Sequence, residues 1–205
     1  MSAPFYLKLI DARAGGLPDA SPLLARGSAL AALCGDLLRG VEGVTFDAVA
    51  GIEGLGFALG AAMATRAGVG FLALHAADGR QAGGQSSGQS SGQAGGQAAF
   101  VEAGGLRLRK RAASPGLRVL LVDDWIEAGD RAQAAAALLE GQGARIVAVA
   151  AIGAGQGERV EALMARTRCV WVWPGGLEVR GVIEAPDAIR SGSACGVWRP
   201  PDPAG

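Results

Sequence analysis

The sequence predicts an α/β domain with a mainly parallel sheet flanked by helices on both faces. The strongest observation is a strand, a loop, a helix and a second strand in succession at residues 118–152. Two earlier apolar runs, at residues 46–52 and 69–74, have the lengths of buried strands. A chain of 205 residues, 50% of them hydrophobic, can bury one substantial core. We therefore expect a single domain spanning residues 1–205.

The overall charge argues against nucleic acid as the main partner. Lys plus Arg and Asp plus Glu number 19 each, so the formal net charge is zero, whereas binding to a phosphate backbone normally needs a basic excess. The cysteines, Cys34, Cys169 and Cys195, have no metal-binding spacing and fit a reducing compartment. No apolar run is long enough to span a membrane, and the first residues lack a secretory pattern. We expect no membrane partner and a cytoplasmic location.

The N-terminal part is expected to hold a strand followed by a long helix. Residues 5–10 form an apolar, strand-like run. Ser21 followed by Pro22 is typical of an N-cap and a first turn, and the helix that they begin is expected to run to about Arg39. Its apolar face repeats at helical spacing through Leu30, Leu33, Leu37 and Leu38.

The middle of the chain alternates ordered and low-complexity segments. A small-residue helix at 59–67 separates the strands at 46–52 and 69–74. Residues 81–97 repeat Gln, Gly and Ser with no apolar group to bury, which predicts a flexible loop. Residues 98–110 return to an ordered pattern.

The unit at residues 118–152 carries the first candidates for a binding site. Its expected elements are strand 119–122, loop 125–130, helix 131–140 ending at Gly141 and Gly143, and strand 145–152. The first strand ends on two adjacent acids, Asp123 and Asp124. Such a βαβ crossover is right-handed, and ligands of open α/β sheets bind at the carboxyl ends of the strands.

Smaller elements are expected after residue 152. They are turn 153–157, helix 158–167, strand 169–173 and a further strand at 177–183. The proline-rich residues 199–205 predict a frayed tail.

The string V-L-L-V-D-D-W-I-E-A-G at residues 119–129 resembles the phosphoribosyl pyrophosphate (PRPP) loop of the type I phosphoribosyltransferases. That signature is an apolar strand, two acids, two variable residues and a loop close to A-T-G-G-T or E-T-G-S. The resemblance implies that Asp123 and Asp124 are catalytic and bind the ribose 2′- and 3′-hydroxyls. It implies a cradle for the 5′-phosphate made by Glu127, Ala128, Gly129, Asp130 and Arg131. Independently, an anion is favoured at a helix N-terminus.

Two further motifs occur in the order of that family. G-I-E-G-L-G-F at residues 51–57 resembles the pyrophosphate loop, which implies contacts from Glu53, Gly54 and Leu55, with Leu55 in place of the usual Arg. L-P-D-A-S-P-L-L at residues 17–24 resembles the F-R-D-I-T-P-L-L segment of adenine phosphoribosyltransferases. This second resemblance implies that Leu17 and Pro18 bind the base.

Weaker resemblances complete the expected site. L-H-A-A-D-G-R at residues 74–80 stands where the family's basic residues meet the diphosphate, so His75 and Arg80 are the candidate cations. A-A-F-V-E-A-G-G-L at residues 98–106 is similar to the family's S-Y-x-L-E-Y-G segment, which places Glu102 on a catalytic-loop glutamate. The repeat at 81–97 coincides with the family's mobile catalytic loop.

The resemblance implies a type I phosphoribosyltransferase fold with a small N-terminal hood. The implied reaction moves the phosphoribosyl group of PRPP to a nucleobase, expected to be a purine of the adenine type, and gives a nucleoside 5′-monophosphate and pyrophosphate. The implied cofactor is Mg²⁺ bound through PRPP, with no metal site of the protein's own. The implied partners are PRPP and a nucleobase, and the expected assembly is a homodimer.

Three residues of the phosphate loop depart from the family pattern and leave two functions open. Ala128 removes a hydroxyl donor. Asp130 adds a charge that repels a phosphate by about 4 kcal/mol per unit pair at ~4 Å, unless it caps its own helix, and Arg131 offsets part of this through charge-assisted contacts. The chain is then either a working transferase with an altered base pocket or a non-catalytic relative that binds a nucleotide, PRPP or a protein partner.

Overall fold

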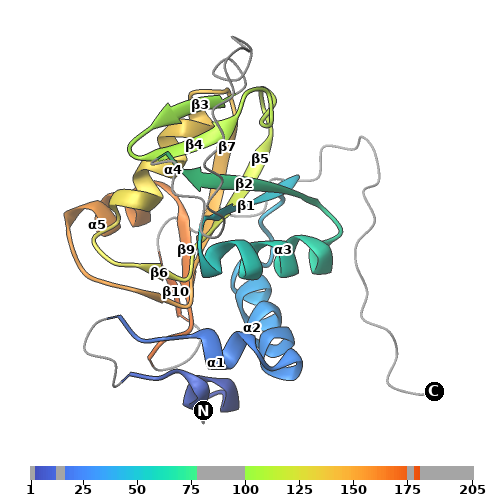
Figure 1. Cartoon of the computed structure of the whole chain (residues 1–205), viewed down its shortest axis with the longest axis vertical. Helices are drawn as coiled ribbons and strands as arrows, with labels where there is room; N and C mark the ends of the chain where they lie inside the picture. Colours follow the sequence, from blue (N-terminus) through green and yellow to red (C-terminus); the bar gives the residue numbers. More distant parts are fainter. Residues whose placement is uncertain (1–2, 13–16, 78–99, 175–177, 181–205) are drawn as a thin grey trace, which may run out of the picture.

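The computed structural model describes residues 3–12, 17–77, 100–174 and 178–180. Within these ranges, eight strands form one sheet in the order β10-β9-β7-β5-β1-β2-β4-β3 (Figure 1). The central strands β9, β7, β5, β1 and β2 are parallel, and β10, β4 and β3 add antiparallel edges, so the predicted mainly parallel sheet is confirmed. The bounds are β1 Ala48–Ile52, β2 Gly70–Ala76, β3 Phe100–Ala103, β4 Leu106–Arg109, β5 Arg118–Val122, β7 Arg145–Ala150, β9 Arg168–Trp171 and β10 Glu178–Arg180.

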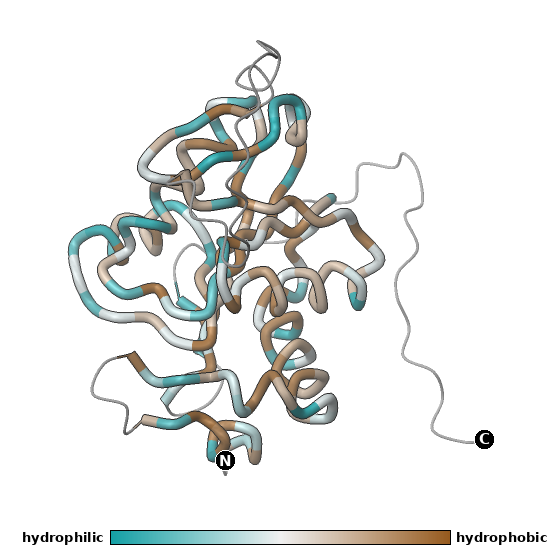
Figure 2. Tube along the Cα trace, viewed as in Figure 1, coloured by the Kyte–Doolittle hydropathy of each residue, from teal (hydrophilic) through white to brown (hydrophobic). Residues whose placement is uncertain are grey.

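Helices cover both faces of this sheet, as the sequence predicts (Figure 1). The helices α2 (Gly27–Gly40) and α3 (Leu55–Ala67) lie on one face, and α4 (Asp130–Glu140) and α5 (Glu158–Arg166) on the other. Neighbouring residues of β1 serve different faces, because Val49 belongs to the buried cluster of α2 and α3 while Ala50 belongs to that of α4 and α5. Figure 2 shows the hydrophobic segments gathered along the strands and α2.

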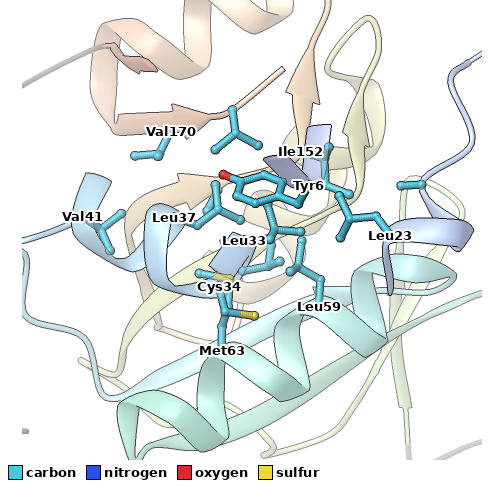
Figure 3. Packing of buried hydrophobic residues seen from close by; sticks show 14 of the residues in the cluster. Tyr6, Leu23, Leu33, Cys34, Leu37, Val41, Leu59, Met63, Ile152 and Val170 are labelled. Carbon is cyan, nitrogen blue, oxygen red and sulfur yellow. The ribbon is translucent and has the colours of Figure 1, made fainter. Parts of the chain in front are cut away.

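The predicted N-terminal strand is wrong. Phe5–Leu9 form a 3₁₀ helix, η1, and its neighbours Tyr6 and Leu7 are both buried, which the alternation of a half-buried strand does not allow. The Tyr6 ring lies among side chains of α2 (Figure 3), and its hydroxyl donates to Asp36 Oδ2 at 2.5 Å. A bridge between Asp11 and Asp19 then leads to α1. This short N-terminal unit packs on α2.

The predicted helix from Ser21 to about Arg39 is two helices. The first, α1, spans Ser21–Leu24, and α2 begins at Gly27 after Arg26, whose backbone is extended. Ser21 is the first helical residue and Ala20 is the N-cap, so the predicted N-cap role of Ser21 is wrong. The Ser21 N–H donates to Asp19 Oδ1 at 2.8 Å. Asp19 therefore satisfies the first N–H of α1 by a local bond from its side chain to the backbone, a contact that the Ser-Pro signal alone does not indicate.

A contact between glycines joins β1 to α3 beside the carboxyl edge of the sheet. A Cβ atom on Gly51 would lie 2.6 Å from the Gly56 carbonyl oxygen and 2.9 Å from the Phe71 ring. We expect Gly51→Ala to lower the free energy of unfolding by about 1–3 kcal/mol, because backbone must shift to admit the methyl group. Gly70→Ala is the matched control in the neighbouring strand, since a Cβ there would meet nothing within 4 Å. Denaturant unfolding that is equal for the two variants would contradict the expectation.

Several sequence-based expectations fall on residues beyond the described ranges. They include the repeat at 81–97, the tail at 199–205, Cys195 and Arg80. Cys34 and Cys169 are buried thiols within the core. Among the helices that the structure describes, none has the length and apolar character needed to cross a membrane.

Candidate active site

Two adjacent acids follow β5 at the carboxyl edge of the sheet, as the sequence predicts. Asp123 is 2% exposed and Asp124 is half-buried. The Asp123 N–H donates to the Ala150 carbonyl at 3.1 Å, and the Ile152 N–H donates to the Asp124 carbonyl at 2.9 Å. The backbone of the pair is thus fixed by β7 and the residues after it, at the edge where ligands of parallel sheets bind.

Burial makes the ionisation of Asp123 unfavourable. Desolvation is the largest cause that raises its pKa, followed by the hydrogen bond with Asp124 and the charge of Asp124, whereas Arg131 lowers the pKa. The resulting pKa of Asp123 is about 8, against an ordinary value of 3.8. Burial and the neighbouring carboxylate of Asp124 therefore favour the protonated form of Asp123.

The raised pKa of Asp123 predicts that stability is lost as the pH rises from about 4 to about 8. The folded chain holds a proton on Asp123 that the unfolded chain releases above about pH 4, so the free energy of unfolding falls as the pH rises from about 4 to about 8. We expect Asp123→Asn to remove this fall, which is on the order of a few kcal/mol. Denaturant unfolding at pH 5 and pH 8 measures it.

Asp47→Asn is the control for this pH dependence. Asp47 lies outside the site, and its hydrogen bonds with Arg118 hold its pKa below the ordinary value. A group with a lowered pKa loses its contribution to stability as the pH falls, so removing Asp47 leaves the loss of stability between pH 5 and pH 8 in place. If wild type and Asp123→Asn had equal slopes between pH 5 and pH 8, the buried proton would not exist.

The loop after the acids is more ordered than the sequence predicts. Trp125–Ile126 form a short strand, β6, that pairs in parallel with β8 (Gly153–Ala154), and the Gly155 N–H donates to Ile126 at 2.7 Å. Gly129 has a φ of 88° and stands directly before α4, which begins at Asp130. The loop encloses a cavity of about 180 Å³ lined by Asp123, Trp125, Ile126, Glu127, Ala128, Gly129, Asp130, Arg131 and Ala132. All five residues predicted for the phosphate cradle line this cavity.

Asp130 neither caps α4 nor stands alone as a negative charge. The N-cap position belongs to Gly129, and the cap of α4 has no side-chain hydrogen bond, so the predicted capping alternative is wrong. Asp130 instead forms an ion pair with the guanidinium of Arg159, in the first turn of α5. Sequence reasoning missed Arg159 because 29 residues separate the two side chains. The only signal in the sequence for a role of Arg159 is that α5, like α4, begins after the carboxyl end of a strand.

Arg131 joins the two predicted anion-binding loops. Its Nη2 donates to the carbonyl oxygen of Glu53 at 2.9 Å. The Glu53 carboxylate in turn accepts from the Ala76 N–H at 2.6 Å and lies 3.6 Å from His75 Nδ1. The predicted pyrophosphate loop, the candidate cation His75 and the phosphate loop therefore meet at one edge of the sheet.

The glycines of the pyrophosphate loop permit this close approach. A Cβ atom on Gly56 would lie 2.9 Å from Asp123 Oδ1, so the first turn of α3 packs directly on the buried acid. Gly54 has a φ of 117°, which favours glycine. Leu55 is the first residue of α3 and packs on the buried cluster of α2 and α3. Its side chain therefore contributes to the core.

The remaining predicted residues are less closely tied to the acids. Leu17 is exposed and Pro18 is half-buried in the segment before α1. Glu102 is exposed on the outermost strand β3, opposite Arg107 of β4. The roles of these residues in binding the base and in the catalytic loop stay predictions.

No metal cluster is formed by the described part of the chain. Within it, no group of three or more His, Cys, Asp or Glu side chains could hold a metal ion. Asp123 and Asp124 are the two adjacent carboxylates that follow β5 at the edge of the sheet.

Comparison with known proteins places these features in a family. A family model described as phosphoribosyl transferase domain matches residues 23–177. The adenine phosphoribosyltransferase of Clavibacter michiganensis subsp. michiganensis is 39% identical over 128 residues, 62% of this chain and 67% of the relative. That of Saccharopolyspora erythraea is 36% identical over 128 residues, 62% and 64% of the two chains. The matches thus span about two thirds or slightly less of these relatives.

Solved structures agree with the sequence relatives. Adenine phosphoribosyltransferase from Thermoanaerobacter pseudethanolicus superposes with a TM-score of 0.55 and 27% identity, over 72% of this chain and 84% of that one. The Giardia lamblia enzyme in complex with 9-deazaadenine gives a TM-score of 0.56 and 28% identity, over 75% and 86%. Because the family model covers residues 23–177, well over half of the sequence, the chain belongs to the phosphoribosyl transferase domain family.

Proposed function

We propose that the chain transfers the phosphoribosyl group of PRPP to a nucleobase, giving a nucleoside 5′-monophosphate and pyrophosphate. The observation that carries this proposal is the hydrogen bond from Arg131 to the Glu53 carbonyl, which brings the phosphate loop and the pyrophosphate loop together beside Asp123. The relatives named above, all adenine phosphoribosyltransferases, support the same reaction.

The proposed reaction needs orientation more than it needs a nucleophile in the protein. A ring nitrogen of the base forms a bond to C1′, the bond from C1′ to the pyrophosphate oxygen breaks, and the nitrogen releases its proton. Asp123 and Asp124 accept hydrogen bonds from the ribose hydroxyls. The backbone N–H groups of the loop before α4 hold the 5′-phosphate at a helix N-terminus. Holding sugar and base in line supplies much of the rate enhancement.

Mg²⁺ fits the donor set of this site when it enters with PRPP. Two adjacent carboxylates and the oxygens of a diphosphate are the hard ligands that Mg²⁺ prefers. The unfavourable second charge on the pair of Asp123 and Asp124 would also be relieved by a nearby cation. When bound, the ion would stabilise negative charge on the departing pyrophosphate.

The base that we propose is a purine of the adenine type. The relatives are adenine phosphoribosyltransferases. The segment before α1 also resembles the base-binding motif of that class. Leu17 offers an apolar side chain to a base face, whereas Pro18 has no backbone N–H to donate.

An assay of pyrophosphate release by the purified chain, with PRPP, Mg²⁺ and a panel of purines and pyrimidines, tests the proposal. We expect release that depends on adenine and that is absent without a base. Release with every base at the same low rate, or with none, would remove the proposed reaction.

A non-catalytic role is the second candidate, and the phosphate loop favours it. Ala128 offers no hydroxyl, and Asp130 and Arg159 pair with each other at the loop. This candidate predicts that calorimetry detects binding of PRPP or AMP while pyrophosphate release stays absent with every base.

The assembly and the location of the chain also stay proposals. A homodimer is the expected assembly, and light scattering coupled to gel filtration at two concentrations tests it. The expected cytoplasmic location is tested by fractionation of cells that produce the chain.

A further inference from the structure

The start of α5 is held against the phosphate loop by its backbone. A Cβ atom on Gly129 would lie 3.1 Å from the carbonyl carbon of Arg159 and 3.1 Å from the Val160 nitrogen. The side-chain amide of Gln133, in α4, donates to the Arg159 carbonyl at 3.1 Å. The backbone of Arg159 is therefore fixed at the loop by two contacts from different residues.

The side chain of Arg159 is far less constrained than its backbone. Its ion pair with Asp130 is 57% exposed on both sides, and exposed pairs of this kind contribute little to stability. If Arg159 leaves Asp130 and pairs with another anion, the chain therefore loses little stability. A cavity of about 560 Å³, lined by Ala128, Gln133, Gly157, Glu158, Arg159 and Ala162, adjoins the side chain and gives it room to turn.

The phosphate loop needs a cation for the ligand that the proposed function assigns to it. Asp130 and Glu127 both line the loop cavity, and each repels a phosphate. Arg131 already donates to the Glu53 carbonyl. A guanidinium forms bidentate, charge-assisted hydrogen bonds with phosphate oxygens, which are stronger than those to neutral groups. Arg159 is the cation paired with the loop's own acid and built into a separate helix.

We propose that Arg159 is a binding residue for the 5′-phosphate. In the free chain the Arg159 guanidinium neutralises Asp130, and it leaves this carboxylate for the phosphate when a nucleotide or PRPP binds. The proposal rests on the proposed function only for the identity of the ligand. Ala128 lines both the loop cavity and the cavity beside Arg159, so the two cavities adjoin at the loop. Asp130, which lines the loop cavity, holds the Arg159 guanidinium at this loop.

Calorimetry with AMP, ribose 5-phosphate and adenosine tests the proposal without requiring turnover. We expect Arg159→Gln to weaken the binding of AMP and ribose 5-phosphate by about 10- to 100-fold and to leave adenosine binding unchanged. Arg166→Gln is the matched control, because Arg166 also joins α5 to α4 through an exposed ion pair, to Glu140 at 3.1 Å. Arg166→Gln should change the affinity for each of the three ligands by less than about twofold. Equal losses for AMP and adenosine would mean a structural role for Arg159 and would overturn the proposal.

The background Asp130→Asn separates direct contact from simple neutralisation. If Arg159 reaches the phosphate, Arg159→Gln still weakens AMP binding when Asp130 is already Asn. If the effect of Arg159→Gln vanishes in that background, Arg159 only neutralises Asp130, and the exchange is refuted. Failure of the wild type to bind any phosphate ester would refute it as well. Phosphate-dependent binding without pyrophosphate release would instead overturn the transferase and leave Arg159 in place.

Discussion

Replacing Asp123 and Asp124 together by asparagine is expected to abolish pyrophosphate release and to weaken PRPP binding by more than about 100-fold. Both side chains leave β5 at the edge where the phosphate loop and the pyrophosphate loop meet. The ribose hydroxyls lose their carboxylate acceptors, and a hydrogen bond to a charged group contributes about 1.5–3 kcal/mol. Calorimetry with PRPP and Mg²⁺ measures the binding.

The fold should survive this double replacement. Asp123 is buried with a pKa of about 8, so a neutral amide of the same size removes a charge that the site resists. We expect thermal unfolding at pH 8 to be unchanged or shifted to higher temperature. Asp47→Asn, away from the site, controls for the loss of an acid in general. Undiminished PRPP binding by the double variant would move the site away from this loop.

Much of the sheet can be predicted from the sequence because the signals that determine its strands and helices act between residues that are close in the chain. The apolar run before Asp123, the helix formers after Gly129 and the glycines that end them each act within a few residues, so β5, α4 and β7 appear close to their expected bounds. The same holds for the glycine turn before α3, which Gly54 permits by its positive φ.

The contacts that complete the site are not local. Arg131 reaches Glu53 across 78 residues, and Arg159 reaches Asp130 across 29. Neither pair has a pattern in the sequence, since any exposed Arg could serve either acid or carbonyl. The error at Tyr6 has the same origin, because the hydrogen bond to Asp36 and the packing on α2 override the strand-like pattern of the first residues.

Arg131→Gln is expected to weaken PRPP binding by about 10- to 100-fold. The substitution removes the charged donor that holds the Glu53 carbonyl at 2.9 Å, and such a bond contributes about 1.5–3 kcal/mol. It also removes the positive charge that lowers the pKa of Asp123. The pKa of Asp123 should therefore rise further, and the pH at which PRPP binding develops should move upward, because the ribose hydroxyls bind the ionised carboxylate.

Arg168→Gln is the matched control for this last effect. Arg168 begins β9 at the opposite edge of the sheet, and its Nη1 donates to the Glu42 carbonyl at 2.7 Å, a bond of the same kind. Its loss should lower stability without altering the pH dependence of binding. Binding titrations from pH 6 to pH 9 separate the two variants. If Arg131→Gln binds PRPP more weakly than wild type but with the same pH profile, Arg131 only holds the two loops together and does not affect the charge of Asp123. A shifted profile for Arg131→Gln alone would show that the same guanidinium both joins the loops and sets the charge of the buried acid.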